Sequence, residues 1–199
     1  MAPKFTDIAF TPSVKALQEH YGSRSMYERV EAMDQTNDTL SPAMVEFIQE
    51  RDGFYLGTVS ASGWPYVQFR GGAPGFLRVL DERTLGFADF NGNSQYLTTG
   101  NLADNDRVFL FLMDYAHRRR LKIWGRATVE YDRPDLLEQL QVPGYPATSQ
   151  RAIVIAIEAW DWNCPQHIPH KYSEQEVLAM VEPLGDRIRN LEAQLARRK

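Results

Sequence analysis

The sequence has little cysteine and no long apolar segment, and each shortage narrows what the protein can be. Its 199 residues include one cysteine, which excludes a disulfide within the chain and fits a reducing compartment. No apolar run approaches the roughly 20 residues that a membrane-spanning helix needs. The first four residues, MAPK, lead into no apolar segment of the signal-peptide type. We therefore expect a cytoplasmic protein that does not bind a membrane.

The chain also lacks an excess of basic residues. Its 22 lysines and arginines stand against 26 acidic residues, which gives a formal net charge of −4 and an isoelectric point near 5.6. Binding to nucleic acid or to anionic membranes needs a net basic surface or a distinct basic face. The composition therefore argues against nucleic-acid binding and predicts a small-molecule partner.

What the sequence does have is enough apolar residues for one sizeable core. Hydrophobic residues make up 43% of the chain and aromatic residues 12%, and a chain of this length favours one structural domain with appendages. We expect an N-terminal helical arm at 1–50 packed on a barrel domain at 51–170, followed by a C-terminal helix at 171–199.

Three segments carry helix signals. Pro12 and Pro42 each follow a hydroxyl residue and precede apolar residues at helical spacing, so each is predicted to begin a helix. The polar stretch 22–40 between them is predicted to be a loop or an arm folded over the barrel. Near the C-terminus, Ser173 and Glu176 form the capping-box pattern S-x-x-E. The apolar residues after them have coiled-coil spacing, which leaves a docking helix and a short coiled coil both open.

The middle of the chain is typical of antiparallel strands joined by hairpins. Segments rich in aromatic and β-branched residues alternate with turn residues, and we expect strands at about 54–60, 64–70, 76–80, 84–90, 108–113, 121–130 and 151–160. One helix is expected at about 94–103, capped by Ser94. This pattern predicts a mainly β (α+β) fold, a six- to seven-stranded antiparallel split β-barrel with flanking helices, because closure removes most exposed strand edges.

Polar residues gather in one stretch of this predicted barrel, between 85 and 126. A strand end breaks into the turn Asp89-Phe90-Asn91-Gly92-Asn93, the predicted helix start follows, and a later hairpin carries three arginines. Helix N-termini and guanidinium groups both suit phosphate, so the stretch is predicted to hold a phosphorylated ligand. Ordinary turn chemistry would also explain the polar residues of the turn.

The order of these pieces resembles the pyridoxamine 5'-phosphate oxidase-like family of FMN-binding split barrels. The resemblance covers 51–167 and rests on three segments, 86–93 (GFADFNGN), 101–108 (NLADNDRV) and 119–127 (RRLKIWGRA). It implies a homodimer that binds FMN at its two-fold interface. Where the oxidases carry an Arg-Lys pair after the polar turn, this chain has Ser94-Gln95, which suggests a divergent flavin-nucleotide-binding branch.

The resemblance also implies which residues bind the flavin. They lie on the second strand, in the polar turn, on the basic hairpin and in the segment after the last strand, which would reach the flavin of the partner subunit. The set is Gln68, Arg70, Asp89, Asn91, Asn93, Ser94, Gln95, Arg119, Arg120, Lys122, Trp162 and Gln166. An exposed strand face and a solvated hairpin would explain the strand pair and the arginine run equally well.

The segment after the last strand invites a metal-binding interpretation that we do not adopt. Cys164, His167 and His170 could be ligands, but three candidates without a fourth are weak for a structural zinc site, and no metal is predicted. Cys164 is instead expected to be a small buried apolar side chain.

The sequence thus predicts an FMN-dependent oxidoreductase that acts on an unknown small molecule. No side chain is an obvious acid-base catalyst, and no catalytic residue is predicted. A non-enzymatic flavin-nucleotide carrier or sensor on the same fold remains the alternative, as does a variant that binds haem or a deazaflavin, because a fold does not fix a function.

Overall fold

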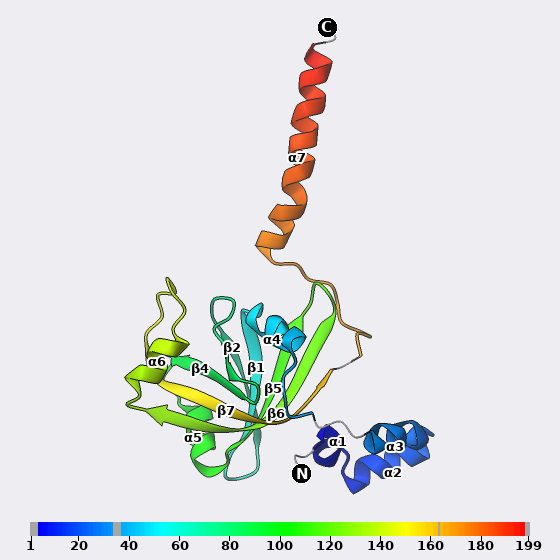
Figure 1. Ribbon diagram of the computed structural model, residues 1–199, viewed down its shortest axis with the longest axis vertical. Coiled ribbons are helices and arrows are strands. Elements are labelled where there is room, and N and C mark those ends of the chain that lie inside the picture. Colours follow the sequence, from blue (N-terminus) through cyan, green and yellow to red (C-terminus); the bar gives the residue numbers. More distant parts are fainter. Residues whose placement is uncertain (1–3, 34–36, 163, 198–199) are drawn as a thin grey trace. The chain divides into compact units, whose positions relative to one another are not determined.

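The structure is a computed structural model that describes residues 4–33, 37–162 and 164–197. Their helices are α1 (Phe5–Ala9), α2 (Pro12–His20), α3 (Arg24–Ala32), α4 (Pro42–Gln49), α5 (Leu97–Asp104), α6 (Pro134–Leu140) and α7 (Glu174–Ala196). Their strands are β1 (Gly53–Val59), β2 (Pro65–Gly71), β3 (Arg78–Asp81), β4 (Thr84–Phe90), β5 (Arg107–Asp114), β6 (Arg119–Tyr131) and β7 (Ser149–Trp162) (Figure 1). Contacts divide the chain into two units, one of 1–113 with 120–164 and one of 114–119 with 165–199.

The seven strands of the described residues form one antiparallel sheet. Its order is β2-β1-β5-β6-β7-β4-β3, and every strand begins and ends within two residues of its expected position. The predicted mainly β fold with flanking helices is therefore confirmed. The division into an arm, a barrel and a C-terminal helix at the predicted boundaries stays a prediction.

The core lies on the inner face of this sheet because apolar residues alternate with polar or outward-facing ones. In β5, Val108, Leu110 and Leu112 are buried, and the residues between them are partly exposed. Side chains of a strand point alternately to opposite faces, so each strand gives one row to the core. Helix α4 adds Phe47 and Ile48, both almost fully buried, to the same apolar cluster.

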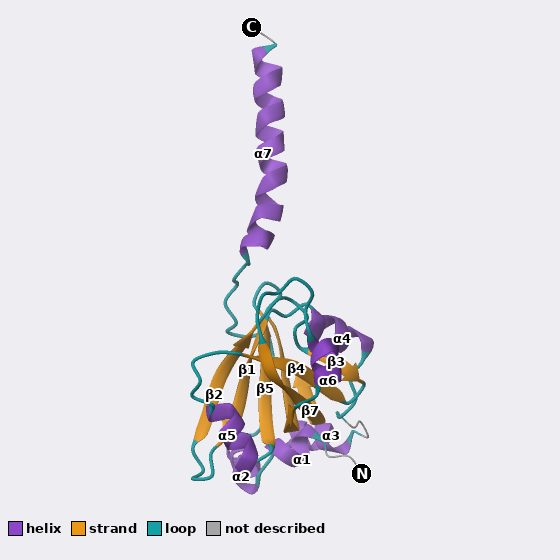
Figure 2. Cartoon of the chain, turned by 90° about the vertical axis from the view of Figure 1, so that its left-hand side faces the viewer, coloured by secondary structure: helices purple, strands orange, loops and turns teal. Residues whose placement is uncertain are grey.

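The sheet curls until β2 comes beside β4, although the two are not neighbours in the sheet order. Arg70 of β2 and Asp89 of β4 form an ion pair with 2.6 Å between Nη1 and Oδ1. Helix α5 lies beside β2 (Figure 2), where the Thr98 hydroxyl donates to Oε1 of Gln68 at 2.7 Å. Side chains rather than backbone pairing thus join β2 to β4, and the barrel is split at this point.

The N-terminal helices differ in part from the expectation. Helices α2 and α4 begin at Pro12 and Pro42 as predicted, but α3 occupies much of the predicted loop at 22–40, where the prediction is wrong. Polar side chains stabilise α3: Arg24 pairs with Glu28 one helical turn away at 3.4 Å and also with Glu31. The apolar residues Met26, Tyr27 and Val30 also follow helical spacing, and the Tyr27 ring packs edge-on against Phe10, so the sequence did carry a helix signal there.

In the second unit, α7 begins as its sequence predicts. The Ser173 hydroxyl accepts from the backbone of Glu176, and the Glu176 carboxylate accepts from the backbone of Ser173, which completes the capping box. Within the part of the chain that the structure describes, no helix combines the length and the apolar character needed to cross a membrane.

Candidate functional site

A pocket of about 210 Å³ lies at the split of the barrel. Strands β2, β4 and β7, the turn after β4 and the start of α5 line it. Seven of the twelve predicted cofactor-binding residues meet there: Gln68, Arg70, Asp89, Asn91, Asn93, Ser94 and Gln95. Residues from the second strand and from the polar turn, about 20 positions apart in the chain, therefore share one pocket.

Asp89 stands at the centre of the pocket's charges. Its Oδ1 lies 2.6 Å from Nη1 of Arg70, and its Oδ2 lies 3.0 Å from Nε of Arg151. The Asp89 side chain is 7% exposed, and those of Arg70 and Arg151 are 13% and 11% exposed. Each charge in this group is thus largely withdrawn from water and is stabilised by its neighbours.

The group carries a surplus of one positive charge. Two guanidinium groups face one carboxylate, and Nε of Arg70 is buried with no hydrogen-bond partner among the described residues. Arg151 also lies over the ring of Tyr96, 4.9 Å from its centroid. The site is partly desolvated, carries surplus positive charge and has an unused donor, and each of these properties favours an anion. The hydrogen bonds that guanidinium groups form with an anion are stronger than those of neutral donors.

Arg151 is the principal residue that sequence reasoning missed. It lies 62 positions after Asp89 on β7, and the two are direct partners in the β4–β7 pairing. Directly paired residues of antiparallel strands point to the same face. The signal that could have found Arg151 is therefore the strand register, which the sequence pattern alone does not specify.

The start of α5 differs from the prediction. The helix begins at Leu97 rather than at Ser94, and its N-cap is Tyr96, which gives no side-chain cap. Ser94 and Tyr96 both have positive φ angles, 59° and 54°, and Oδ1 of Asn93 accepts from the Gln95 backbone at 3.2 Å. The polar turn thus extends to Tyr96, because its own side-chain bonds hold these residues out of helical conformation.

The first turn of α5 lies at the pocket. Thr98 and Thr99 both line it, and the first amides of a helix have no partner within the helix. Gln68 accepts a hydrogen bond from Thr98, and the side-chain amide of Asn91 donates to the Thr148 hydroxyl at 3.1 Å. These bonds join β2 to the start of α5, and the polar turn to the segment just before β7.

A smaller pocket of about 150 Å³ adjoins the first. It shares Arg70 and Phe90 with the polar pocket, and Phe69, Phe76 and Phe87 are among its other lining residues. The two together offer an anion-binding end and an aromatic surface, a combination that suits a ligand with a charged group and a ring system.

Five predicted residues do not line the polar pocket. Lys122 is paired with Asp161 at 2.5 Å, Nε of Arg120 is buried without a hydrogen-bond partner in the described chain, and the Trp162 ring packs edge-on against Phe47. Arg119 and Gln166 belong to the second unit. The positions of these five side chains do not show which ligand, if any, each of them contacts.

Cys164 is exposed, so the expectation that it is buried is wrong. It follows the end of β7, beyond the last residue that packs against the core. Across the residues that the structure describes, no three His, Cys, Asp or Glu side chains gather in a way that could hold a metal ion.

Comparison with known proteins identifies one family and one fold. A family model described as pyridoxamine 5'-phosphate oxidase matches residues 40–164. The crystal structure of HupZ from Group A Streptococcus is 16% identical with a TM-score of 0.52, covering 67% of this chain and 99% of that one. A candidate pyridoxamine 5'-phosphate oxidase from Lactobacillus delbrueckii is 21% identical with a TM-score of 0.50, covering 64% and 99%. At these identities the two structures show a shared fold. No curated protein matches the chain.

Proposed function

The chain belongs to the pyridoxamine 5'-phosphate oxidase family, and on that premise we propose that it binds FMN, with the phosphate in the polar pocket, and acts as a flavin-dependent oxidoreductase on a small molecule. The surplus positive charge around Asp89 is the observation that carries this proposal. A phosphate there would meet two guanidinium groups and the first amides of α5.

The same observation accounts for the Ser94-Gln95 pair. The turn lacks the Arg-Lys pair of the oxidases, so a phosphate bound there needs a cation from elsewhere in the fold. We now assign that role to Arg70 and Arg151, which line the pocket. Trp162 and Gln166 remain proposed contacts to the flavin of a second subunit, and Arg119, Arg120 and Lys122 remain proposed contacts from the basic hairpin.

The protein's own contribution is binding and orientation. When bound, FMN would supply the redox chemistry. Arg70 and Arg151 would hold its phosphate, and Gln68, fixed by Thr98, would present its amide nitrogen to the ligand. Among the described residues that line the pocket there is no histidine, cysteine or lysine, and the one carboxylate is held between two arginines.

Absorption spectroscopy tests FMN binding. We expect the purified protein to be yellow, or the ligand-free protein to take up FMN in preference to FAD and riboflavin in a fluorescence titration. A colourless protein without measurable FMN affinity would overturn the proposal, and a haem or deazaflavin spectrum would replace FMN with that cofactor.

The lack of an acid-base side chain also suits the second candidate function, a non-enzymatic flavin-nucleotide carrier or sensor. Both candidates bind FMN, and they differ in turnover. An oxidoreductase should be reduced anaerobically by NADH or NADPH and reoxidised on mixing with an electron acceptor. Bound FMN that neither nucleotide reduces would favour the carrier.

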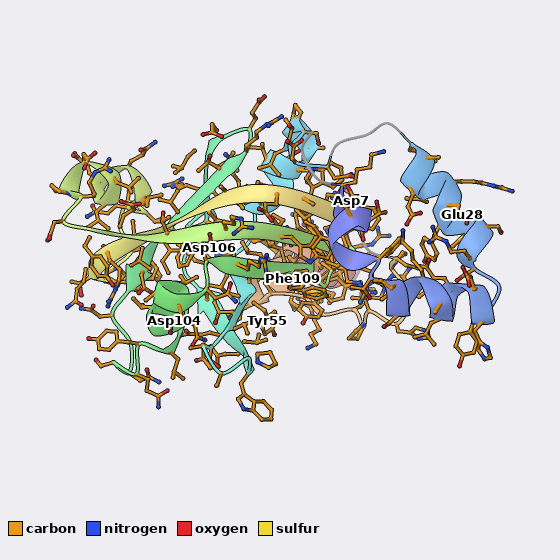
Figure 3. All side chains as sticks on the ribbon, turned by 90° about the horizontal axis from the view of Figure 1, so that it is seen from below. Asp7, Glu28, Tyr55, Asp104, Asp106 and Phe109 are labelled. Atoms are coloured by element: carbon orange, nitrogen blue, oxygen red, sulfur yellow. The ribbon has the colours of Figure 1, made fainter. Side chains whose placement is uncertain are left out.

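We also propose that the protein is a homodimer joined through the outer face of β1, β2 and β5. Tyr55, Val67 and Phe69 are exposed on this face, by 39%, 61% and 59%. Phe109 of β5 lies on the same side of the sheet as Tyr55 (Figure 3). Contiguous exposed aromatic side chains of this kind mark protein interfaces.

Phe69 should be the anchor of that interface. Its ring lies over Gly53 and Gly71, where an added Cβ would come within 2.4 and 2.8 Å of ring atoms. We expect Phe69→Asp to weaken self-association about 30-fold, because a central aromatic contributes about 2 kcal/mol or more to an interface. Analytical ultracentrifugation measures the change. Tyr21→Asp, at an aromatic that is 78% exposed on the N-terminal arm, is the matched control, and equal effects of both substitutions would rule out this face.

A further inference from the structure

Helix α7 carries an apolar stripe that nothing in its own unit buries. No residue of the helix is buried. The members of the stripe are between 43% and 64% exposed and are spaced alternately four and three residues apart: Val177, Val181, Leu184, Ile188, Leu191 and Leu195. This is the 3.5-residue repeat of a coiled coil, kept over the whole helix.

The residue types at the two heptad positions indicate a two-stranded, parallel coil. At the four central positions, Val181 and Ile188 are β-branched residues at a, and Leu184 and Leu191 are leucines at d. The two end positions depart from this pattern, because Val177 is at d and Leu195 is at a. β-branched residues at a with leucine at d favour parallel dimers over trimers and tetramers.

The charges beside the stripe agree with a parallel register. Arg187 is at a g position and Glu192 at the e position five residues later, the two positions that face each other between helices of a parallel pair. Neither takes part in an ion pair within the described chain. Asp186 and Arg189, which point away from the stripe, pair with each other at 2.5 Å instead. Arg187 and Glu192 are thus available for a partner helix.

The breaks in the helix also fall away from the stripe. Pro183 is at a c position, on the outer side, and the helix continues through it. A proline inside a helix removes one backbone hydrogen bond, and its ring crowds the carbonyl four residues earlier, which bends the helix. At a c position, however, the ring does not enter the seam. A membrane surface fits the helix less well than a second helix, because α7 has five acidic and two basic residues, and amphipathic helices that bind anionic lipid are rich in lysine and arginine.

We propose that α7 forms a parallel, in-register, two-stranded coiled coil with α7 of a second copy of this chain. The six stripe residues form the seam, and Arg187 of each helix pairs with Glu192 of the other. With about three heptads the coil is short for independent stability, and tethering through the barrels would raise its effective concentration. The inference does not depend on FMN binding.

Disulfide formation at single positions tests both pairing and direction. In a Cys164→Ser background, Leu191→Cys places a thiol at a d position, and Asn190→Cys places one on the outer side one residue away. In a parallel coil each d residue faces its own copy. We therefore expect Leu191→Cys to form the intermolecular disulfide about tenfold faster than Asn190→Cys at equal protein concentration, measured on a non-reducing gel.

Equal rates at the two positions would overturn the proposal. In three other arrangements, residue 191 lies no closer to residue 191 of a second copy than residue 190 lies to residue 190. These are an antiparallel pair, a helix docked on its own chain and a helix bound to a membrane. Both positions are exposed on the helix, so we expect both variants to fold like the unaltered protein. Circular dichroism and an FMN titration check that they do. Unchanged FMN binding with equal rates would reject the coil and leave the proposed function intact.

The charge pair gives an independent test. Glu192→Arg in the Leu191→Cys chain sets like charges against Arg187 of the other helix, and we expect disulfide formation to slow several-fold. Adding Arg187→Glu restores opposite charges and should restore the rate. A double variant as slow as Glu192→Arg alone would contradict the parallel register.

Discussion

Replacing Arg151 with glutamine is expected to weaken FMN binding about ten- to a hundredfold. Arg151 contributes one of the two guanidinium groups at the pocket, and the loss of a hydrogen bond to a charged group costs roughly 1.5–3 kcal/mol. The fold should tolerate the change because Asp89 keeps its 2.6 Å contact with Arg70. Fluorescence titration with FMN measures the effect, and riboflavin, which has no phosphate, should lose far less affinity.

The matched control is Arg107→Gln. Arg107 is exposed at the start of β5 and does not line the polar pocket, so its replacement should leave FMN affinity within about twofold. If the two substitutions weaken FMN binding equally, or if Arg151→Gln weakens riboflavin as much as FMN, the arginine does not hold the phosphate.

Replacing Asp89 with alanine is expected to lower the free energy of unfolding by about 3–5 kcal/mol. The carboxylate is 7% exposed and compensates two guanidinium groups that are also largely buried. Removing it leaves two like charges close together with poor access to water, a change of the kind that costs about this much when one partner of a buried ion pair is lost. Urea unfolding followed by tryptophan fluorescence measures the difference.

Asp104→Ala serves as the control for this prediction. Asp104 is exposed at the last residue of α5 (Figure 3), and its loss should change stability by less than about 0.5 kcal/mol. Asp89→Asn keeps the side-chain shape and one acceptor and should fall between the two. A stability loss for Asp89→Ala no larger than for Asp104→Ala would mean that the charges around Asp89 are not coupled.

The strands could be predicted from the sequence because burial imposes a local pattern on them. In β5, the alternation of Val108, Leu110 and Leu112 with more exposed residues is visible in the sequence, as are the turn residues that end the strands. The polar turn from Asp89 to Asn93 could be recognised because its residue types are those that form turns. Gln68 and Arg70 came from the family resemblance, since their alternation also fits an exposed strand face.

The rest depended on contacts that local patterns do not specify. Arg151 joins the pocket only through the pairing of β4 with β7. Helix α3 was predicted as a loop because the run of polar residues at 34–39 outweighed the helical spacing of Met26, Tyr27 and Val30. The ion pair of Lys15 with Glu31, at 2.9 Å, joins side chains whose distance in space the sequence does not give. The start of α5 was misplaced because Ser94 and Tyr96 adopt left-handed conformations that are uncommon for residues other than glycine.

The ratio of the riboflavin and FMN dissociation constants for the unaltered protein tests the central claim most directly. The two ligands share one ring system and differ by the phosphate, so the ratio isolates what the charges around Asp89 contribute. If Arg70, Arg151 and the first amides of α5 hold the phosphate, FMN should bind at least about tenfold more tightly. Equal dissociation constants for the two ligands would contradict the assignment of this pocket as the phosphate site.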